Sequence, residues 1–156
     1  FYFGTKYSEA FNAFYINKKG NKKLIHSGSY GIGVSRLVAA IIEANFDDRG
    51  IIWPKQVTPY DIGLINVRSD NEISNNFSEV FYKKFNKKYE IIYDDRDVRV
   101  GDKFNNMDLL GIPLQIIAGE KNLSNSYIEI KERVTGKSEL ISVDKIESYL
   151  EYKCEF

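Results

Sequence analysis

The sequence GSYGIGVSRLVAAIIE, residues 28–43, joins a glycine-rich segment to an apolar repeat. Glycine occupies positions 28, 31 and 33, and the aliphatic residues that follow have the i, i+3, i+4, i+7, i+8 spacing of one helix face: Val34, Leu37, Val38, Ile41 and Ile42. This pattern predicts a helix that begins directly after the glycines. Because an apolar stripe is stable only against a partner surface, we expect this helix to be buried.

Arg36 falls in the first turn of the predicted helix. A cation there opposes the positive end of the helix dipole, so the position is unfavourable unless an anion lies nearby. The free N–H groups of the helix start and the guanidinium would converge on one anion, and phosphate fits both. The alternative is a tight strand-to-helix turn whose arginine pairs with a distant carboxylate. The glycine spacing matches neither the P-loop nor the dinucleotide fingerprint, so the residues alone leave both interpretations open.

Three separate blocks of sequence carry a resemblance to a known family. Residues 28–43 resemble motif 3 of class II aminoacyl-tRNA synthetases, and GTKYSEAFNA (residues 4–13) and RGIIWP (residues 49–54) are similar to the flanking segments of bacterial prolyl-tRNA synthetases. Residues 94–123 resemble the anticodon-binding domain of the same family. The blocks occur in the family's order, so the resemblance covers nearly the whole chain.

The resemblance implies a role for Arg36 in ATP binding. In the family, the motif 3 arginine holds the γ-phosphate of ATP, bridged by Mg²⁺, while the proline carboxylate attacks the α-phosphorus; a fixed guanidinium stabilises the departing pyrophosphate. Gly31 and Gly33 would let the backbone pass close beneath the nucleotide. The ATP and proline pocket implied by the resemblance consists of Thr5, Gly28, Ser29, Tyr30, Gly31 and Gly33, and no metal ligands are predicted in these residues.

Composition limits the class of protein. The 156 residues are 43% hydrophobic and 14% aromatic, which is enough for a core, and 22 basic residues balance 22 acidic ones, so any RNA binding must be local rather than driven by bulk charge. Cys154 is the single cysteine and indicates a reducing compartment. No apolar run approaches the ~20 residues of a membrane span, and the N-terminus lacks the order of a signal peptide. We expect a soluble, cytoplasmic protein with no membrane partner.

The N-terminal part is predicted to be a small antiparallel sheet. Residues 1–4 end a strand, and residues 11–16 pair with residues 24–26 as a hairpin whose turn, NKKGNKK, faces water. His26, the only histidine, is a tempting catalytic residue, but a lone histidine on a strand is more often an edge residue, and the family's reaction depends on positioning and charge stabilisation. The chain lacks an initiator methionine and begins in an aromatic stretch, as expected of a segment from a larger protein.

Residues 46–59, FDDRGIIWPKQVTP, interrupt the helical period and contain two of the three prolines. This composition predicts a linker, with Trp53 as a packing anchor. We therefore expect two domains. Residues 1–56 would form the motif 3 end of an α+β catalytic domain with an antiparallel sheet, and residues 57–156 an α/β anticodon-binding domain.

After the linker the pattern alternates between strands and helices. The predicted strands are residues 62–67, 90–93 and 114–118, with a hairpin over residues 126–143 that turns at Thr135-Gly136-Lys137. Helices are predicted from a capping box at residues 69–72, over residues 101–110, and from a second capping box at residues 144–147. The first is expected to bury Ile73, Phe77, Val80, Phe81 and Phe85. This order predicts a mixed sheet of about five strands flanked by three helices.

A charged cluster, DDRDVRVGDK over residues 94–103, runs from the end of a predicted strand into the next helix. This is the crevice where α/β sheets bind ligands. Proline anticodons carry two guanines, and arginine reads guanine O6 and N7 while a carboxylate reads its N1–H and N2–H. With the resemblance, the predicted anticodon contacts are Asp95 with Arg96, and Arg99 with Lys103 on the phosphates. Without it, a solvated salt-bridge cluster would be the simpler interpretation.

The sequence thus predicts the C-terminal part of a proline–tRNA ligase, with tRNA(Pro), proline and ATP with Mg²⁺ as partners and a homodimer for the full-length enzyme. Motifs 1 and 2 do not occur in these residues, so the chain alone is expected to be inactive in adenylate formation. Two alternatives remain open. One is a non-catalytic, synthetase-like RNA-binding or regulatory paralogue, and the other is a threonyl or glycyl relative within class II.

Overall fold

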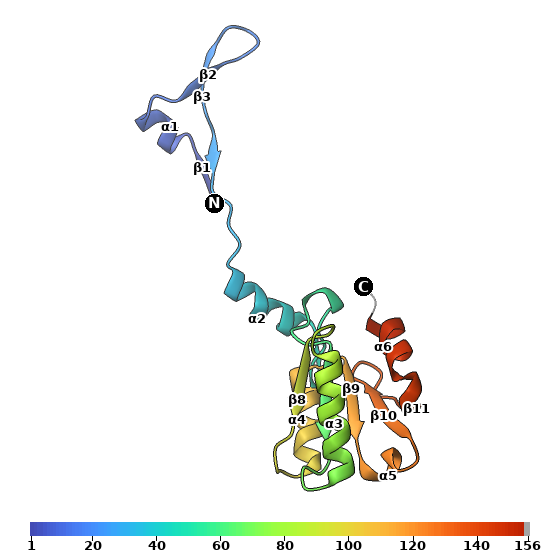
Figure 1. Ribbon diagram of the computed structural model, residues 1–156. Helices are drawn as coiled ribbons and strands as arrows, with labels where there is room; N and C mark the ends of the chain where they lie inside the picture. Colours follow the sequence, from blue (N-terminus) through green and yellow to red (C-terminus); the bar gives the residue numbers. More distant parts are fainter. Residues whose placement is uncertain (155–156) are drawn as a thin grey trace. The chain divides into compact units, whose positions relative to one another are not determined.

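The computed structural model describes residues 1–154, and the chain divides into two compact units. The first is Phe1–Val38, and the second runs from Ala39 to the end of the described residues (Figure 1). Within the described residues, no helix has both the length and the apolar character that crossing a membrane requires.

The first unit is built from two small antiparallel sheets. Strand β1 (Tyr2–Gly4) pairs with β4 (Ser27–Gly28), and β2 (Phe14–Ile16) pairs with β3 (Lys22–Leu24). The predicted hairpin is therefore confirmed, but its second strand is residues 22–24 instead of 24–26, so its turn is shorter than predicted. Its turn is closed by the Asn17 side chain, whose Oδ1 accepts hydrogen bonds from the backbone N–H groups of Lys19 and Asn21 at 3.0 and 2.9 Å.

One helix of the first unit was not expected from the sequence. Helix α1 (Lys6–Ala10) is a single short turn that follows Gly4, whose φ is +57°. Ser8 holds it in place, because its buried hydroxyl donates to the Ile25 carbonyl at 2.6 Å. Five residues are too few to show a helical period, so the pattern could not reveal this element.

Helix α2 (Val34–Ala44) forms where the glycine-led repeat predicts it, but the prediction that it is buried is wrong for this structure. None of its residues is buried, and Val34, Leu37 and Val38 are 76%, 47% and 49% exposed. The division between the two units falls inside this helix, between Val38 and Ala39. The stripe is thus exposed at Val34, Leu37 and Val38 and half-buried at Ile41 and Ile42.

The second unit contains the predicted mixed sheet of five strands, in the order β11-β10-β9-β7-β8 (Figure 1). Strands β8 (Ile91–Asp94) and β9 (Leu114–Ala118) run parallel to the central β7 (Ile62–Asn66). Strand β10 (Tyr127–Glu132) is antiparallel to β9, and β11 (Ser138–Ser142) completes a hairpin with it. The chain passes from β7 to β8 through α3 and from β8 to β9 through α4, because parallel strands need crossover connections.

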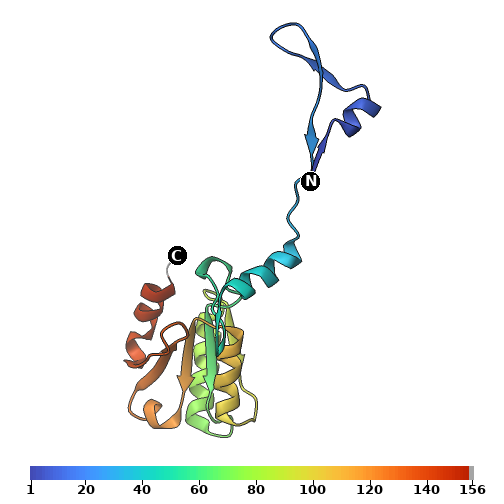
Figure 2. The same cartoon turned by 180° about the vertical axis from the view of Figure 1, so that it is seen from behind.

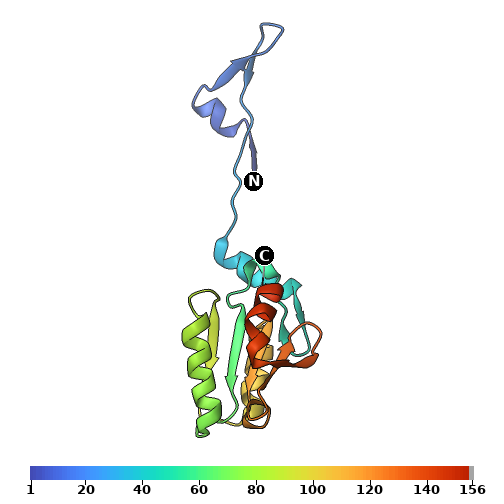
Figure 3. The ribbon, with the colours of Figure 1, turned by 45° about the vertical axis from the view of Figure 1, so that its right-hand side comes forward.

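Helices cover both faces of this sheet. Helices α3 (Glu72–Phe85) and α6 (Ile146–Cys154) lie on one face, and α4 (Val100–Leu110) lies on the other, as the view from behind in Figure 2 shows. Figure 3 shows α3 and α6 from the side. The three predicted helices are confirmed, and a short fourth helix, α5 (Glu120–Leu123), was not predicted.

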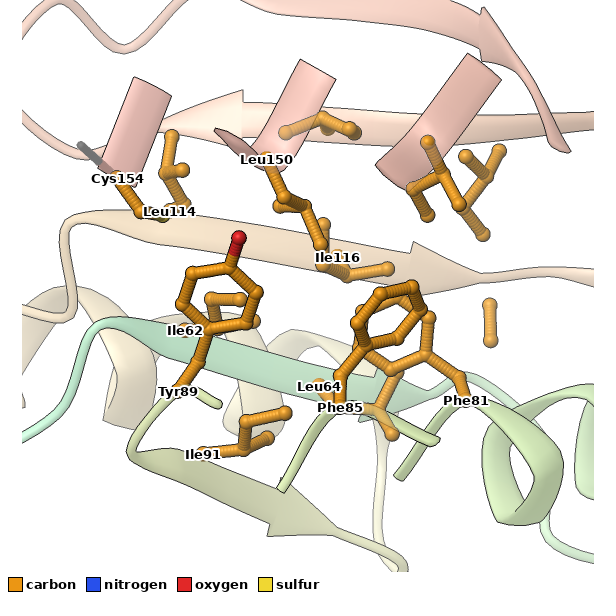
Figure 4. Packing of buried hydrophobic residues seen from close by; sticks show 14 residues of the cluster. Ile62, Leu64, Phe81, Phe85, Tyr89, Ile91, Leu114, Ile116, Leu150 and Cys154 are labelled. Atoms are coloured by element: carbon orange, nitrogen blue, oxygen red, sulfur yellow. The ribbon is translucent and has the colours of Figure 1, made fainter. Parts of the chain in front are cut away.

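The larger core lies between the sheet and helices α3 and α6 (Figure 4). Alternate residues of the central strands point into it, and the helices contribute aromatic and aliphatic side chains to the same layer. Its central members are Ile62, Leu64, Phe81, Phe85, Leu114, Ile116, Ile128 and Leu150. The smaller core on the α4 face is formed by Ile65, Met107, Ile112 and Ile117.

A glycine on β7 allows α4 to pack closely against the sheet. A Cβ atom on Gly63 would stand 2.8 Å from Met107 Sδ and 3.1 Å from Ile112 Cγ2. Helix α4 then ends at Gly111, whose φ of +74° is the left-handed conformation that favours glycine. Gly63 therefore permits the close approach of α4 to the sheet, and Gly111 determines where α4 ends.

The capping predictions were only partly right. Asn71 caps α3 by accepting a hydrogen bond from Ser74 N at 3.0 Å, so the predicted Ser69 cap is wrong by two residues. The buried face of α3 also differs from the prediction, because Ser74 and Ser78 are buried whereas Ile73 and Val80 are 44% and 66% exposed. Before α6, Asp144 lies in a 3-10 turn, η2 (Val143–Lys145), instead of capping the helix itself.

The predicted linker carries structure of its own. Strands β5 (Phe46–Asp47) and β6 (Gly50–Ile51) form a small hairpin, and a 3-10 turn, η1 (Lys55–Val57), follows. The hairpin belongs to the second unit, because Asp47 pairs with Arg133. The Trp53 indole N–H donates to the Leu110 carbonyl at 2.8 Å. The compact units thus divide at residues 38/39, and the domain boundary near residue 57 stays a prediction.

Candidate functional site

The charged cluster forms the loop between β8 and α4, at the carboxyl end of a parallel strand. Strand β8 ends at Asp94, and Arg99 is the residue that precedes the first turn of α4, with φ −57° and ψ 134°. Because these angles are not helical, Arg99 is the N-cap residue, and the helix begins at Val100. The loop therefore projects from the sheet edge where ligands of α/β proteins bind.

The centre of this loop is a two-pronged ion pair between Arg96 and Asp94. Arg96 Nε donates to Asp94 Oδ1 at 2.9 Å, and Arg96 Nη2 donates to Asp94 Oδ2 at 2.7 Å. Only 5% of the Asp94 side chain is exposed, compared with 51% of Arg96. The hydrogen bonds from Arg96 and the positive charge of Lys103 hold the pKa of Asp94 below its usual value. The carboxylate thus remains ionised and fixes the guanidinium at the surface.

Lys103 lies in the interior and not on the surface where a phosphate contact is expected. It is 1% exposed, and its Nζ donates to the Asn66 carbonyl at the end of β7, at 2.6 Å. The cause is its place on the inner face of α4, four residues before buried Met107. In this position the ammonium supports the strand end and the nearby Asp94, but it is not accessible to an RNA backbone.

Asp95 and Arg99 are exposed. Within residues 1–154 neither side chain makes an ion pair or a hydrogen bond with another residue of the protein. Both are therefore available to a partner. The structure brings Asp95, Arg96 and Arg99 together on one loop, and it separates Lys103 from them.

A cavity of about 310 Å³ adjoins the ion pair, between edge strand β8 and helix α4. Its apolar wall is formed by Ile92, Met107 and Leu110, and its polar side by Asp94, Arg96 and Asn106. This volume is at the lower end of the range for small-molecule sites. An apolar wall with a few converging polar groups suits a flat heteroaromatic ligand.

Several polar groups near this edge were missed by the sequence analysis. Asn66 ends the buried strand β7 with 0% exposure, and its Oδ1 and the Tyr93 hydroxyl have no hydrogen-bond partner within the described residues. Asp94 belongs to the charged cluster, but the sequence does not predict that it is the partner of Arg96. The available signal is positional, because Asn66 and Asp94 are the polar residues that end two apolar strands in IGLIN and IIYD.

The residues predicted for the nucleotide pocket lie in the first unit and in the first turn of α2. Arg36 is exposed and, among the described residues, pairs with no carboxylate. Thr5 donates its hydroxyl to Glu9 Oε1 at 2.6 Å. Ser29 N donates to the Phe1 carbonyl at 2.8 Å, and Tyr30 is 95% exposed. Among residues 1–154, no hydrogen bond or ion pair joins the Thr5 or Arg36 side chain to residues 28–33.

The glycines of this segment differ in how much room surrounds them. A Cβ on Gly28 would lie 3.2 Å from the Phe1 carbonyl oxygen, so the β1–β4 pairing itself favours glycine there. A Cβ on Gly31 would meet nothing within 4 Å, and one on Gly33 only Arg36 Cβ at 3.6 Å. The described residues thus give no steric reason for glycine at positions 31 and 33.

Among residues 1–154, no three His, Cys, Asp or Glu side chains gather as a metal site. The described residues therefore do not fit a protein-ligated Mg²⁺ ion.

Comparison with known proteins agrees with this geometry. Residues 61–153 match the family model described as "Anticodon binding domain", and since this is more than half of the chain, the chain belongs to that family. Among curated proteins it is 44% identical over 146 residues to the "Proline--tRNA ligase" of Staphylococcus aureus strain Newman, and equally so to those of strains COL and MRSA252.

The match covers 94% of this chain, which spans about a quarter of the length of these relatives, 26%. The similarity is to the C-terminal portion of prolyl-tRNA synthetase, so the resemblance expected from the sequence blocks is confirmed.

Proposed function

We propose that this chain acts as the C-terminal part of a proline–tRNA ligase and that the loop between β8 and α4 contacts the anticodon of tRNA(Pro). The observation that carries this proposal is the exposed Arg96 guanidinium, fixed by buried Asp94 at the carboxyl end of β8 in a matched anticodon-binding domain. Residues 57–156 would form that domain, and residues 1–56 the end of the catalytic domain. The names of the relatives favour proline over threonine or glycine.

Charge and exposure divide the roles within the loop. Arg96 presents N–H donors for guanine O6 and N7, and the exposed Asp95 carboxylate suits the N1–H and N2–H donors of guanine. Arg99 lies at the start of α4, where a backbone phosphate would also meet the positive end of the helix dipole. Lys103 supports the strand end beneath these three residues.

In the proposed whole enzyme, ATP and proline would bind beside residues 28–33. Arg36 would hold the γ-phosphate and stabilise the pyrophosphate that leaves when the proline carboxylate attacks the α-phosphorus. Thr5, Gly28, Ser29 and Tyr30 would line the pocket, and Gly31 and Gly33 would leave room for the nucleotide. We also propose Mg²⁺ as the counter-ion of the triphosphate, a homodimer for the whole enzyme, and a place in the cytoplasm.

Two assays test this proposal. The chain should bind an anticodon stem-loop RNA with two loop guanines at least tenfold more tightly than the same RNA with both guanines changed to adenine, at one fixed salt concentration. Equal affinity for the two RNAs would contradict anticodon recognition. In a proline-dependent pyrophosphate exchange assay the 156-residue chain alone should be inactive, because motif 2 does not occur in it. Clear exchange activity would contradict the assignment of catalysis to the whole enzyme.

A further inference from the structure

The Asp94 carboxylate occupies only one edge of the Arg96 guanidinium. Asp94 accepts from Nε and from one hydrogen of Nη2, whereas a guanidinium carries five N–H donors. Nη1 and the second Nη2 hydrogen have no acceptor among the described residues. These nitrogens form a second fork, with the spacing that matches two adjacent acceptors on a flat ligand.

This second fork belongs to a side chain that lines the cavity between β8 and α4. The apolar wall of the cavity offers contact to the face of a base, and Asp94 and Arg96 stand together at its polar side. RNA recognition of this kind uses unstacked loop bases that are hydrogen-bonded along their edges. The cavity and the fork therefore suit one ligand, a purine with two acceptors on its Hoogsteen edge, and guanine is that purine.

We propose that Asp94 is the positioning residue that gives this site its guanine preference: it holds Arg96 so that the free fork meets O6 and N7 of a guanine seated in the cavity beside α4. This inference rests on the anticodon-binding function proposed above. Without Asp94 the arginine would keep its charge and its attraction for phosphates, but its side chain would be free to rotate. Asp94 thus acts through Arg96 and does not contact the RNA.

Because Asp94 is buried, its positioning of Arg96 can be distinguished from the effect of a negative charge elsewhere in the loop. Its side chain is 5% exposed, so the ion pair is shielded from competing water on the carboxylate side. Hydrogen bonds from Arg96, together with the positive charge of Lys103 in the interior, lower the pKa of Asp94 and keep its carboxylate ionised. Asp97, in the same loop, is exposed and makes no hydrogen bond or ion pair with Arg96 in the described structure, so it supplies a matched control of equal charge.

The test measures the affinity of the chain and its variants for the anticodon stem-loop RNA, and for RNAs in which each loop guanine is replaced in turn by adenine or by 7-deazaguanine, which lacks the N7 acceptor. Asp94→Asn should reduce the guanine-over-adenine preference at one position about tenfold, and Asp97→Asn should leave it unchanged. At the same position 7-deazaguanine should weaken binding to the wild type and have little further effect on Asp94→Asn.

A double-mutant cycle separates positioning from a merely structural role. In an Arg96→Ala background, Asp94→Asn should cause no further loss of guanine preference, since the group that it positions is gone. Additive losses, or a preference unchanged by Asp94→Asn in a chain with wild-type melting temperature, would overturn the proposal.

Two further outcomes are decisive. If Asp94→Asn does not fold, Arg96→Lys carries the test, because an ammonium cannot span both O6 and N7, and an undiminished guanine preference in that variant would overturn the proposal. If the wild-type chain shows no guanine preference at all, the anticodon function itself fails and this inference fails with it. If the wild-type chain prefers guanine and Asp94→Asn leaves that preference unchanged, only the inference about Asp94 is overturned, and the anticodon function stands.

Discussion

Arg133 and Asp47 form a two-pronged ion pair across 86 residues of sequence, with Nη2–Oδ1 at 2.6 Å and Nη1–Oδ2 at 2.9 Å. The Arg133 side chain is 0% exposed, and its Nε donates to the Asp108 carbonyl on α4. Arg133, which follows the last residue of β10, therefore connects the β5–β6 hairpin and α4 to that end of the strand by hydrogen bonds. The contact explains why residues 46–51 pack with the sheet although their composition predicts a linker.

The pair leads to a stability prediction. Asp47→Ala should lower the melting temperature of the chain by about 5 °C or more, because it leaves the Arg133 guanidinium buried without a counter-charge. Asp48→Ala, which removes an exposed carboxylate from the same hairpin, should change the melting temperature by only about 1–2 °C. Thermal unfolding followed by circular dichroism measures both variants, and equal shifts would contradict a structural role for the pair.

Stability should also depend on pH in the acid range. Hydrogen bonds from Arg133 hold the pKa of Asp47 below its usual value, and those from Arg96 do the same for Asp94. Because the unfolded chain binds protons at higher pH than the folded chain, this contribution is complete above about pH 4 and is lost as the pH falls further. Urea midpoints measured between pH 6 and pH 3 should decline below about pH 4, and less steeply in Asp47→Asn. Parallel declines would contradict the assignment to Asp47.

The thiol of Cys154 should react slowly. Burial raises its pKa to about 11, and its side chain is only 8% exposed, so little thiolate is present at pH 8. We expect alkylation by iodoacetamide to be at least tenfold slower than for a cysteine in a short peptide, and to reach the peptide's rate in urea. A rate equal to the peptide's in the folded chain would show that the α6 packing around Cys154 is wrong.

Arg99 provides a test of the phosphate contact. If its guanidinium neutralises one phosphate, Arg99→Ala should weaken binding to the guanine and adenine stem-loops by a similar factor. It should also reduce the slope of log affinity against log salt by about 0.7–1, the value for one released counterion. Loss of guanine preference with an unchanged salt slope would instead assign Arg99 to base contact.

Much of the second unit follows from local sequence patterns. The strands IGLIN, IIYD and LQIIA are apolar runs bounded by turn residues, and the glycine that ends α4 is visible directly. These signals are local because a strand needs only a few β-forming residues in succession. The order of strands and helices then restricts the sheet to a mixed arrangement.

The parts that could not be predicted depend on partners distant in sequence. Nothing local indicates that Arg133 and Lys103 are buried, because their burial is stabilised by Asp47 and by the Asn66 carbonyl, which are 86 and 37 residues away. A different reason applies to Arg96: its partner Asp94 is only two residues away, but the sequence pattern does not show which of the neighbouring carboxylates is buried and faces the guanidinium. Helix α2 gives a further example: its apolar spacing predicts the helix correctly, but the spacing does not show whether another surface covers it.

The most direct test of the anticodon interface is an NMR titration of the ¹⁵N-labelled chain with the guanine-containing anticodon stem-loop. We expect the largest amide shift changes in residues 94–99 and around Asn106, and we expect them to shrink with the adenine-containing RNA. Shift changes confined to the β10–β11 hairpin and α6, with residues 94–99 unaffected, would contradict it.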